Sequence, residues 1–204
     1  AAILTYQNEG FLQTEPDMSK YALNHFDYSL GLPFYYVLQS DSILYWGMND
    51  VRKLACAMKS ACFSMHMLAV RNKLFVRGAV SRGHVAINPM VGIYHGKPIV
   101  EAVGIEKQMK VPGIIIPLTY LNHDERLQLV QHLPYFVPCT YRFRDGKTDK
   151  CLYVNWVYFY VQDTNVVGFD QLGERLRLDG HRPEDVDLLI AFLSDNQDTF
   201  PFPA

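Results

Sequence analysis

The chain has 204 residues, of which 49% are hydrophobic and 20% are charged, and this composition excludes an intrinsically disordered protein. The length is sufficient for one hydrophobic core and predicts a single domain over residues 1–204. A formal net charge of −2 excludes the strongly basic surface typical of proteins that bind duplex nucleic acid, so we expect no nucleic-acid partner.

The sequence also indicates where the protein resides. It contains no run of about 20 apolar residues, the length that a membrane-spanning helix needs, and its start has no basic segment followed by a long apolar core. Its four cysteines have no Cys-x-x-Cys spacing and are interpreted as buried, reduced thiols. We therefore expect a cytoplasmic protein with no membrane partner.

Two elements in the first half of the chain are predicted most clearly. Aromatic and β-branched residues flank Ser40-Asp41-Ser42, a pattern that predicts a β-hairpin over Phe34–Trp46 with its turn at this tripeptide. Apolar residues recur at three- and four-residue steps between Asp50 and Val70. This spacing predicts a helix with Asn49 or Asp50 as its N-cap.

The remaining predicted elements alternate strands with helices. In chain order they are a strand within residues 1–11, a helix and loop within residues 15–30, strands over Leu74–Val80 and His84–Ile87, a short extended segment over Gly92–His95, a helix over Pro98–Lys110, a strand over Gly113–Thr119, an antiparallel pair over Tyr135–Tyr141 and Cys151–Val161, and a helix from Pro183 to Ser194. This order predicts an α+β fold with a mostly antiparallel sheet and flanking helices.

Three segments carry a resemblance to a known family. They are Ser40-Asp41-Ser42-Ile43, Arg77-Gly78-Ala79-Val80-Ser81 with Gly83 two residues later, and the pattern Gly-x-Pro-x-Val-Glu-Ala-x-x-Ile-Glu from Gly96 to Glu106 followed by Pro112-Gly113-Ile114. In this order they resemble the class III nucleotidyl cyclase homology domain, most of all the small bacterial pyrimidine cyclases of the Pycsar antiphage systems. The resemblance covers residues 35–116 and leaves residues 118–204 as a C-terminal elaboration.

The resemblance implies a fold, a reaction and partners. The fold would have a ferredoxin-like core, and the reaction would convert a nucleoside triphosphate into a 3′,5′-cyclic nucleotide and pyrophosphate. Mg²⁺ or Mn²⁺ would neutralise the triphosphate. UTP is favoured over CTP as substrate, and the cyclic product would serve as a second messenger in antiphage defence. Family domains resemble half-sites, so the resemblance also implies a homodimer.

Four residues receive candidate roles. Asp41 matches the hairpin aspartate that holds the metal, and its alternative is an Asx-type turn. Tyr35 stands where purine cyclases have a base-reading lysine, and its alternative is an ordinary strand aromatic. Arg82 offers donors to a uracil carbonyl, and its alternative is a solvated turn residue. Arg77 lies in an apolar run, where an unpaired charge is costly, so we expect a structural ion pair first and triphosphate contact second.

Two departures from the family pattern keep other functions open. Gln7 stands where the family has its first metal aspartate, and an amide binds Mg²⁺ poorly. Val100 and Gly104 align with the asparagine and arginine that stabilise the transition state, so no catalytic residue is assigned. The alternatives are a catalytically inactive module that binds nucleotide or a partner, and a generic interaction protein. A C-terminal basic set is interpreted as a solvated loop or as a triphosphate contact: Arg142, Arg144, Lys147 and Lys150.

Overall fold

The strands of the main sheet come from nearly the whole length of the chain. The structure is a computed structural model that describes residues 2–7, 23–27, 32–39, 42–48, 50–88, 93–131 and 135–200. Its strands are β1 (Ala2–Gln7), β2 (Leu23–Asp27), β3 (Leu32–Gln39), β4 (Ser42–Met48), β5 (Arg77–Gly83), β6 (Ala86–Asn88), β7 (Ile93–His95), β8 (Gly113–Pro117), β9 (Phe136–Arg142) and β10 (Thr148–Val154). Its helices are α1 (Val51–Asn72), α2 (Lys97–Gln108), the short 3₁₀ helix η2 (Leu118–Tyr120), α3 (His123–Val130), α4 (Val157–Thr164), α5 (Phe169–Leu178) and α6 (Pro183–Asp195).

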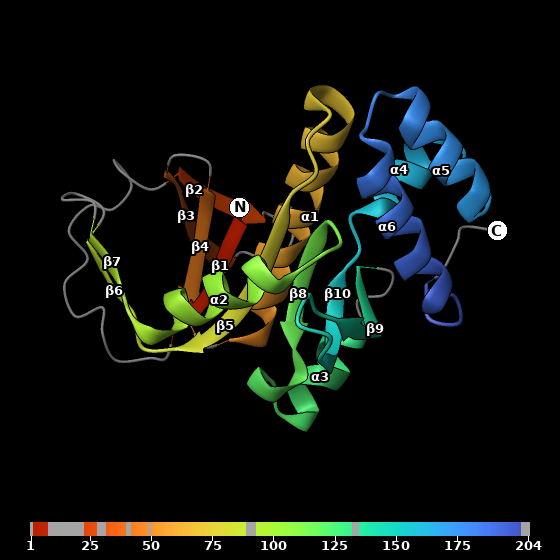
Figure 1. The fold of residues 1–204 in the computed structure, drawn as a ribbon. Coiled ribbons are helices and arrows are strands. Elements are labelled where there is room, and N and C mark those ends of the chain that lie inside the picture. Colours follow the sequence, from red (N-terminus) through yellow and green to blue (C-terminus); the bar gives the residue numbers. More distant parts are fainter. Residues whose placement is uncertain are drawn as a thin grey trace.

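The main sheet mixes parallel and antiparallel pairs. Its order is β2-β3-β4-β1-β5-β8-β10-β9, and β6 and β7 form a separate pair (Figure 1). Of the seven neighbouring pairs that the described strands form in the main sheet, four are antiparallel and three are parallel. The predicted mixture of helices with a mostly antiparallel sheet is therefore confirmed. The parallel pairs join β4, β1, β5 and β8 in the centre, where α1 and α2 provide the helical crossovers that parallel strands require.

Helix α1 forms for the reasons that its sequence indicates. The Asp50 carboxylate accepts a hydrogen bond from the Arg52 backbone N–H at 2.8 Å and caps the first turn. Its apolar stripe is buried against the sheet and includes Leu54, Met58 and Met65. The predicted helix and its N-cap are thus confirmed.

The two faces of the sheet carry different helices. Arg77 at the start of β5 contacts Glu106 of α2 at 3.3 Å, whereas Arg82 near its end contacts Glu125 of α3 at 3.0 Å. The two arginines are an odd number of residues apart, so their side chains leave opposite faces of the strand. Helix α2 therefore covers one face, and α3, which packs beside α1, covers the other.

The C-terminal helices extend the core at one side of the molecule, where α4, α5 and α6 gather (Figure 1). Phe192 of α6 packs against the rings of Tyr141 and Tyr153, with centroid distances of 5.5 and 5.0 Å. Both tyrosines are fully buried. Residues after 118 are therefore part of the same hydrophobic core as the first half of the chain.

Several predicted elements are confirmed. Strands β3 and β4 form the expected hairpin, and α2 and α6 begin and end within two residues of their predicted bounds. The four cysteines are free and buried, as expected: Cys56, Cys62, Cys139 and Cys151. Helices of the described residues are all too short or too polar to cross a bilayer.

Three predicted elements are wrong in part. The strand expected over Leu74–Val80 is shifted towards the C-terminus and runs over Arg77–Gly83. The strand expected over Cys151–Val161 ends at Val154, and α4 follows, because Val157, Tyr160 and Val161 lie at helical spacing and are buried together. Within the predicted helix and loop of residues 15–30, the described part is the strand β2. Helices α3 and α5 were not predicted, although Asn122 and Glu125 form a capping box at the start of α3.

Candidate functional site

The β3–β4 hairpin has a two-residue connection. Gln39 pairs with Ser42, so only residues 40 and 41 lie between the two paired strands. Asp41, the expected metal ligand, lies outside the described residues. Tyr35, the expected base-reading residue, pairs through its backbone with Trp46, four residues from the Gln39–Ser42 pair.

Gln7 lies at the other end of the sheet from this connection. It pairs with Met48 at the end of β4 and with Gly83 at the end of β5, whereas the hairpin connection precedes Ser42. Six residues of extended strand separate the two positions, which is about 20 Å. The structure therefore does not bring Gln7 and the hairpin connection together within one chain.

Arg82 is held at the carboxyl end of β5. Its Nη1 lies 3.0 Å from an oxygen of Glu125 and donates to the Tyr120 carbonyl oxygen at 3.2 Å. The expected alternative of a solvated turn residue is wrong, because Arg82 belongs to a strand and is tied to α3 and η2.

Arg77 forms the structural ion pair that was expected first. Its Nε lies 3.3 Å from Glu106, whose side chain is only 10% exposed, and its Nη1 donates to the Met109 carbonyl oxygen at 3.0 Å. Because Arg77 and Arg82 occupy opposite ends and opposite faces of β5, the structure does not bring these two candidate nucleotide ligands together within one chain.

A hydrogen-bonded polar group lies near Arg82 on the other face of β5. The buried Ser81 hydroxyl and the Tyr120 hydroxyl both donate to Glu101 Oε2, at 3.1 and 3.2 Å. Burial raises the pKa of Tyr120, and the Glu101 carboxylate adds to that rise. This group joins α2 to β5 and η2 with its acceptors already occupied, so its evident role is structural.

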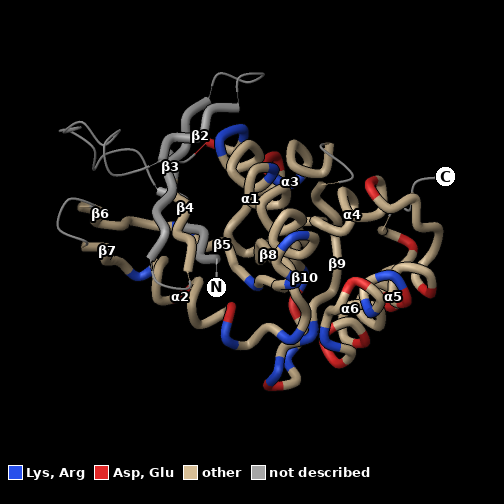
Figure 2. Tube along the Cα trace, turned by 90° about the horizontal axis from the view of Figure 1, so that it is seen from above, with Lys and Arg blue, Asp and Glu red and all other residues tan. Residues whose placement is uncertain are grey.

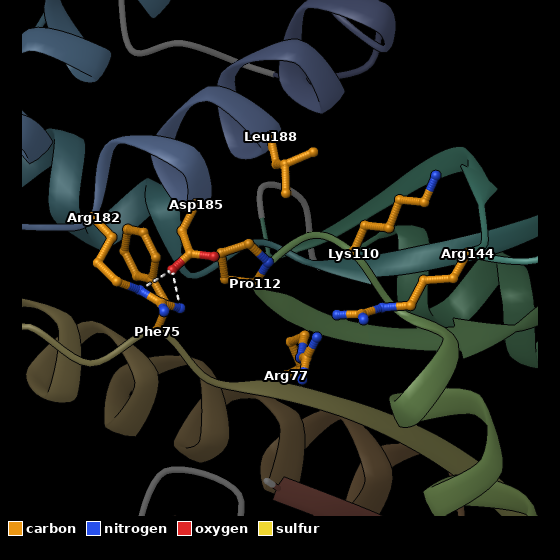
Figure 3. Close-up of a pocket in the computed structure, with 8 residues that line it drawn as sticks. All are labelled: Phe75, Arg77, Lys110, Pro112, Arg144, Arg182, Asp185 and Leu188. Atoms are coloured by element: carbon orange, nitrogen blue, oxygen red, sulfur yellow. Dashed lines mark hydrogen bonds and ion pairs between the residues drawn. The ribbon is translucent and has the colours of Figure 1, made fainter.

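A cavity of about 460 Å³ opens at the start of β5, and we call it the cationic cavity. Four basic residues line it, together with one acid, Asp185 (Figure 3). They are Arg77 of β5, Lys110 of the α2–β8 loop, Arg144 of the β9–β10 turn and Arg182 beside α6. Figure 2 shows basic residues of the β9–β10 turn close to α6. The cavity therefore joins residues that lie far apart in the sequence.

The charges around the cationic cavity are only partly balanced. Arg182 pairs with Asp185 at 2.8 Å, and Arg77 pairs with Glu106. Lys110 and Arg144 make no ion pair within the described part of the chain. The four basic side chains and their two carboxylate partners leave an excess of two positive charges, which favours the binding of an anion.

Buried tyrosines hold the cavity wall in place. The Tyr141 hydroxyl oxygen accepts from the backbone N–H groups of Lys110 and Val111, at 3.0 and 2.9 Å. The Tyr153 hydroxyl donates to the Pro112 carbonyl oxygen at 2.7 Å. The α2–β8 loop is therefore fixed before any ligand arrives.

Arg77 and Arg144 were visible in the sequence, Arg144 as one member of a basic set, whereas Lys110 and Arg182 were not predicted to belong to a site. No local pattern marks these two residues, because each lies in a different connection and only the fold brings them together. The Arg182-Pro183 pair was visible as a helix start, which explains its position but not its role.

The described residues were also tested as metal ligands. No three His, Cys, Asp or Glu side chains of these residues converge as a metal site requires. Comparisons with protein-family models, with curated proteins and with solved structures found no match.

Proposed function

We propose that the protein is a pyrimidine nucleotide cyclase, which makes a 3′,5′-cyclic nucleotide and pyrophosphate from UTP in preference to CTP. The observation that carries this proposal is the hairpin register, in which Gln39 pairs with Ser42. Asp41 is thereby one of two residues in the connection, the position at which the resembled family holds its metal aspartate. A carboxylate in a two-residue connection is positioned by the strands on both sides and reaches a ligand beyond the sheet.

Tyr35 and Arg82 are the proposed base-reading residues. The Tyr35 backbone lies four residues from the Gln39–Ser42 pair, which is about 13 Å along β3 and within the reach of a nucleoside triphosphate. Arg82 lies at the carboxyl end of the parallel strands β1 and β5, level with Gly47 and five residues along β4 from Ser42, so the proposed homodimer, and not one chain alone, would bring it to a base bound near a hairpin connection. Arg77 is left out of the substrate site, because its guanidinium faces α2 and the cationic cavity.

The proposed reaction is an internal phosphoryl transfer. The ribose 3′-oxygen attacks the α-phosphorus, the bond from phosphorus to the pyrophosphate oxygen breaks, and the 3′-hydroxyl proton leaves to solvent or a base. A bound Mg²⁺ or Mn²⁺ would stabilise the charge on the phosphates. None of the described residues is assigned as the base, and Asp41 is the proposed metal ligand.

The remaining properties follow from the same resemblance. The chain has one cyclase-like segment, residues 35–116, so a homodimer would complete the active site with a second copy. We propose a cytoplasmic enzyme whose cyclic product acts as a second messenger in antiphage defence.

A second candidate function is a cyclase-homology module that binds nucleotide without turnover. The position of Gln7 favours this module. Strand β1 contains no carboxylate side chain, and its carboxyl end, where Gln7 lies, is at the opposite end of the sheet from the hairpin connection. Such a module would keep nucleotide affinity and lack a second metal carboxylate.

Incubation of the purified protein with each nucleoside triphosphate and Mn²⁺ or Mg²⁺ distinguishes these proposals. A cyclic nucleotide from UTP, detected by chromatography and mass spectrometry, supports the cyclase. Cyclic AMP from ATP without product from UTP or CTP contradicts the base assignment. UTP binding without product supports the inactive module, and absence of any nucleotide binding contradicts both functions.

A further inference from the structure

We propose that the cationic cavity binds a phosphorylated small molecule that carries a ring, at a site separate from the proposed substrate site. This inference does not depend on cyclase activity. It starts from the size of the cavity, about 460 Å³, which lies within the range typical of small-molecule sites.

The cationic cavity has uncompensated positive charge. Two of the four basic residues that line the cavity have carboxylate partners, Arg77 with Glu106 and Arg182 with Asp185. Lys110 and Arg144 have no such partner among the described residues. A ligand with two negative charges, such as a phosphate monoester, matches this excess.

Two guanidinium groups of the cavity lie close to each other. Nη1 of Arg77 and Nε of Arg144 each donate to the carbonyl oxygen of Met109 at 3.0 Å. The two nitrogens can be no farther apart than the sum of these distances, so the groups lie together, as Figure 3 shows. Each guanidinium has further N–H donors, and its planar fork fits the oxygens of a phosphate.

The backbone segments that carry Lys110 and Arg144 are preorganised. Tyr141 fixes the backbone of Lys110, and the Arg144 backbone N–H donates to the Gln108 carbonyl oxygen at 2.9 Å. The loops that carry these cations are therefore held by the core, and a phosphate would not have to order them.

The apolar residues of the cavity wall indicate which group the ligand carries besides its phosphate. Phe75 and Leu188 line the cavity together with the cations. The Phe75 ring stacks on His181 with a centroid distance of 4.1 Å and an interplanar angle of 9°, which fixes its orientation. The flat face of a ring in the ligand would pack against this wall while its phosphate contacts Arg77 and Arg144.

The site would connect two parts of the chain. Arg77 and Lys110 belong to the segment that resembles a cyclase, whereas Arg144 and Leu188 belong to residues 118–204. A ligand that contacts both would stabilise the packing of α6 and the β9–β10 turn against the start of β5, and its binding would raise the melting temperature.

Calorimetric titration without divalent metal, in EDTA, tests the proposal with UMP, inorganic phosphate and uridine as probes. We expect UMP to bind more tightly than phosphate, and uridine not to bind. Arg144→Gln and Lys110→Gln should each weaken UMP binding by roughly tenfold or more, the loss of one charge-assisted contact. Arg142→Gln is the matched control, because Arg142 is exposed on the same hairpin and does not line the cavity.

Each outcome decides part of the proposal. Absence of UMP binding by the folded wild-type protein overturns it, as does wild-type affinity in both Arg144→Gln and Lys110→Gln. Equal affinity for phosphate and UMP overturns the apolar part of the site. Asp41→Asn should leave UMP affinity in EDTA unchanged, since the hairpin connection does not belong to this cavity. A large loss in that variant would show that the probe occupies the proposed substrate site instead.

Discussion

Arg77 and Arg144 share one hydrogen-bond acceptor, the carbonyl oxygen of Met109, which lies 3.0 Å from a nitrogen of each guanidinium. Like charges at this separation repel each other, and Glu106 lies beside only Arg77. The shared carbonyl therefore offsets part of the repulsion between two side chains from opposite halves of the chain. An anion in the cavity would offset more of it.

Asp41→Asn should abolish cyclic nucleotide formation while leaving the fold intact. Asparagine is well suited to a turn but removes the charge that a divalent metal needs. We expect turnover of UTP with Mn²⁺ to fall at least 100-fold, with a melting temperature close to that of the wild type. Ser40→Ala, at the other residue of the connection, is the control and should retain turnover. If Asp41→Asn keeps wild-type turnover, Asp41 is a turn residue and not a metal ligand.

Gly113→Ala should strongly destabilise the protein. The backbone φ of Gly113 is +144°, and an added Cβ would overlap the ring of the buried Tyr153. Overpacking and strained backbone together should lower the free energy of unfolding by about 3 kcal/mol or more. Gly146→Ala also has a positive φ, +87°, but its Cβ would meet no atom within 4 Å. Urea denaturation should show a loss of only about 1 kcal/mol in that control, and equal losses in the two variants would contradict the packing argument.

Tyr141→Phe should loosen the wall of the cationic cavity. The variant keeps the buried ring but removes the acceptor for the backbone N–H groups of Lys110 and Val111. One buried and one partly buried donor without partners should lower the free energy of unfolding by about 1–3 kcal/mol. Hydrogen exchange of these two amides, measured by NMR, should accelerate. Unchanged exchange would mean that the hydroxyl does not hold the loop.

His181 should make stability depend on pH. Its ring is buried against Phe75, and burial together with the nearby charge of Lys73 lowers the pKa of His181 below its usual 6.5. The unfolded chain therefore takes up this proton at a higher pH than the folded protein does. Stability contributed by neutral His181 is complete above about pH 7 and is lost as the pH falls through 6.5 towards the lower folded pKa.

Denaturation at several pH values between 5 and 7.5 measures this effect. The glutamine of His181→Gln cannot take up a proton in this range, so the free energy of unfolding should vary less with pH than in the wild type. The comparison uses the slope and not the absolute stability, because the substitution also removes the stacked ring. An identical slope in both proteins would exclude His181 as the source of the dependence.

Local pattern predicted much of the fold. The helical spacing between Asp50 and Val70 was sufficient for α1, because a continuous apolar stripe has one way to be buried on a sheet. The aromatic and β-branched residues around Ser40-Asp41-Ser42 were sufficient for the hairpin, because strand pairing across a short turn is local. Helix α4 was not predicted, because the segment Val157–Val161 contains strand-forming residues as well as helical spacing. Burial of its apolar side chains against the core selected the helix.

The candidate sites depended on the tertiary structure. The sequence placed Arg77 in a strand and Arg82 just after it, but only the tertiary structure put both in β5 and gave them partners on opposite faces, Glu106 of α2 and Glu125 of α3. In the same way, Arg144 was visible as part of a basic turn, and its meeting with Arg77 required β8 and β10 to be neighbours in the sheet. Periodicity reports which face of an element is buried, whereas strand order and crossover connections determine which distant side chains share a cavity.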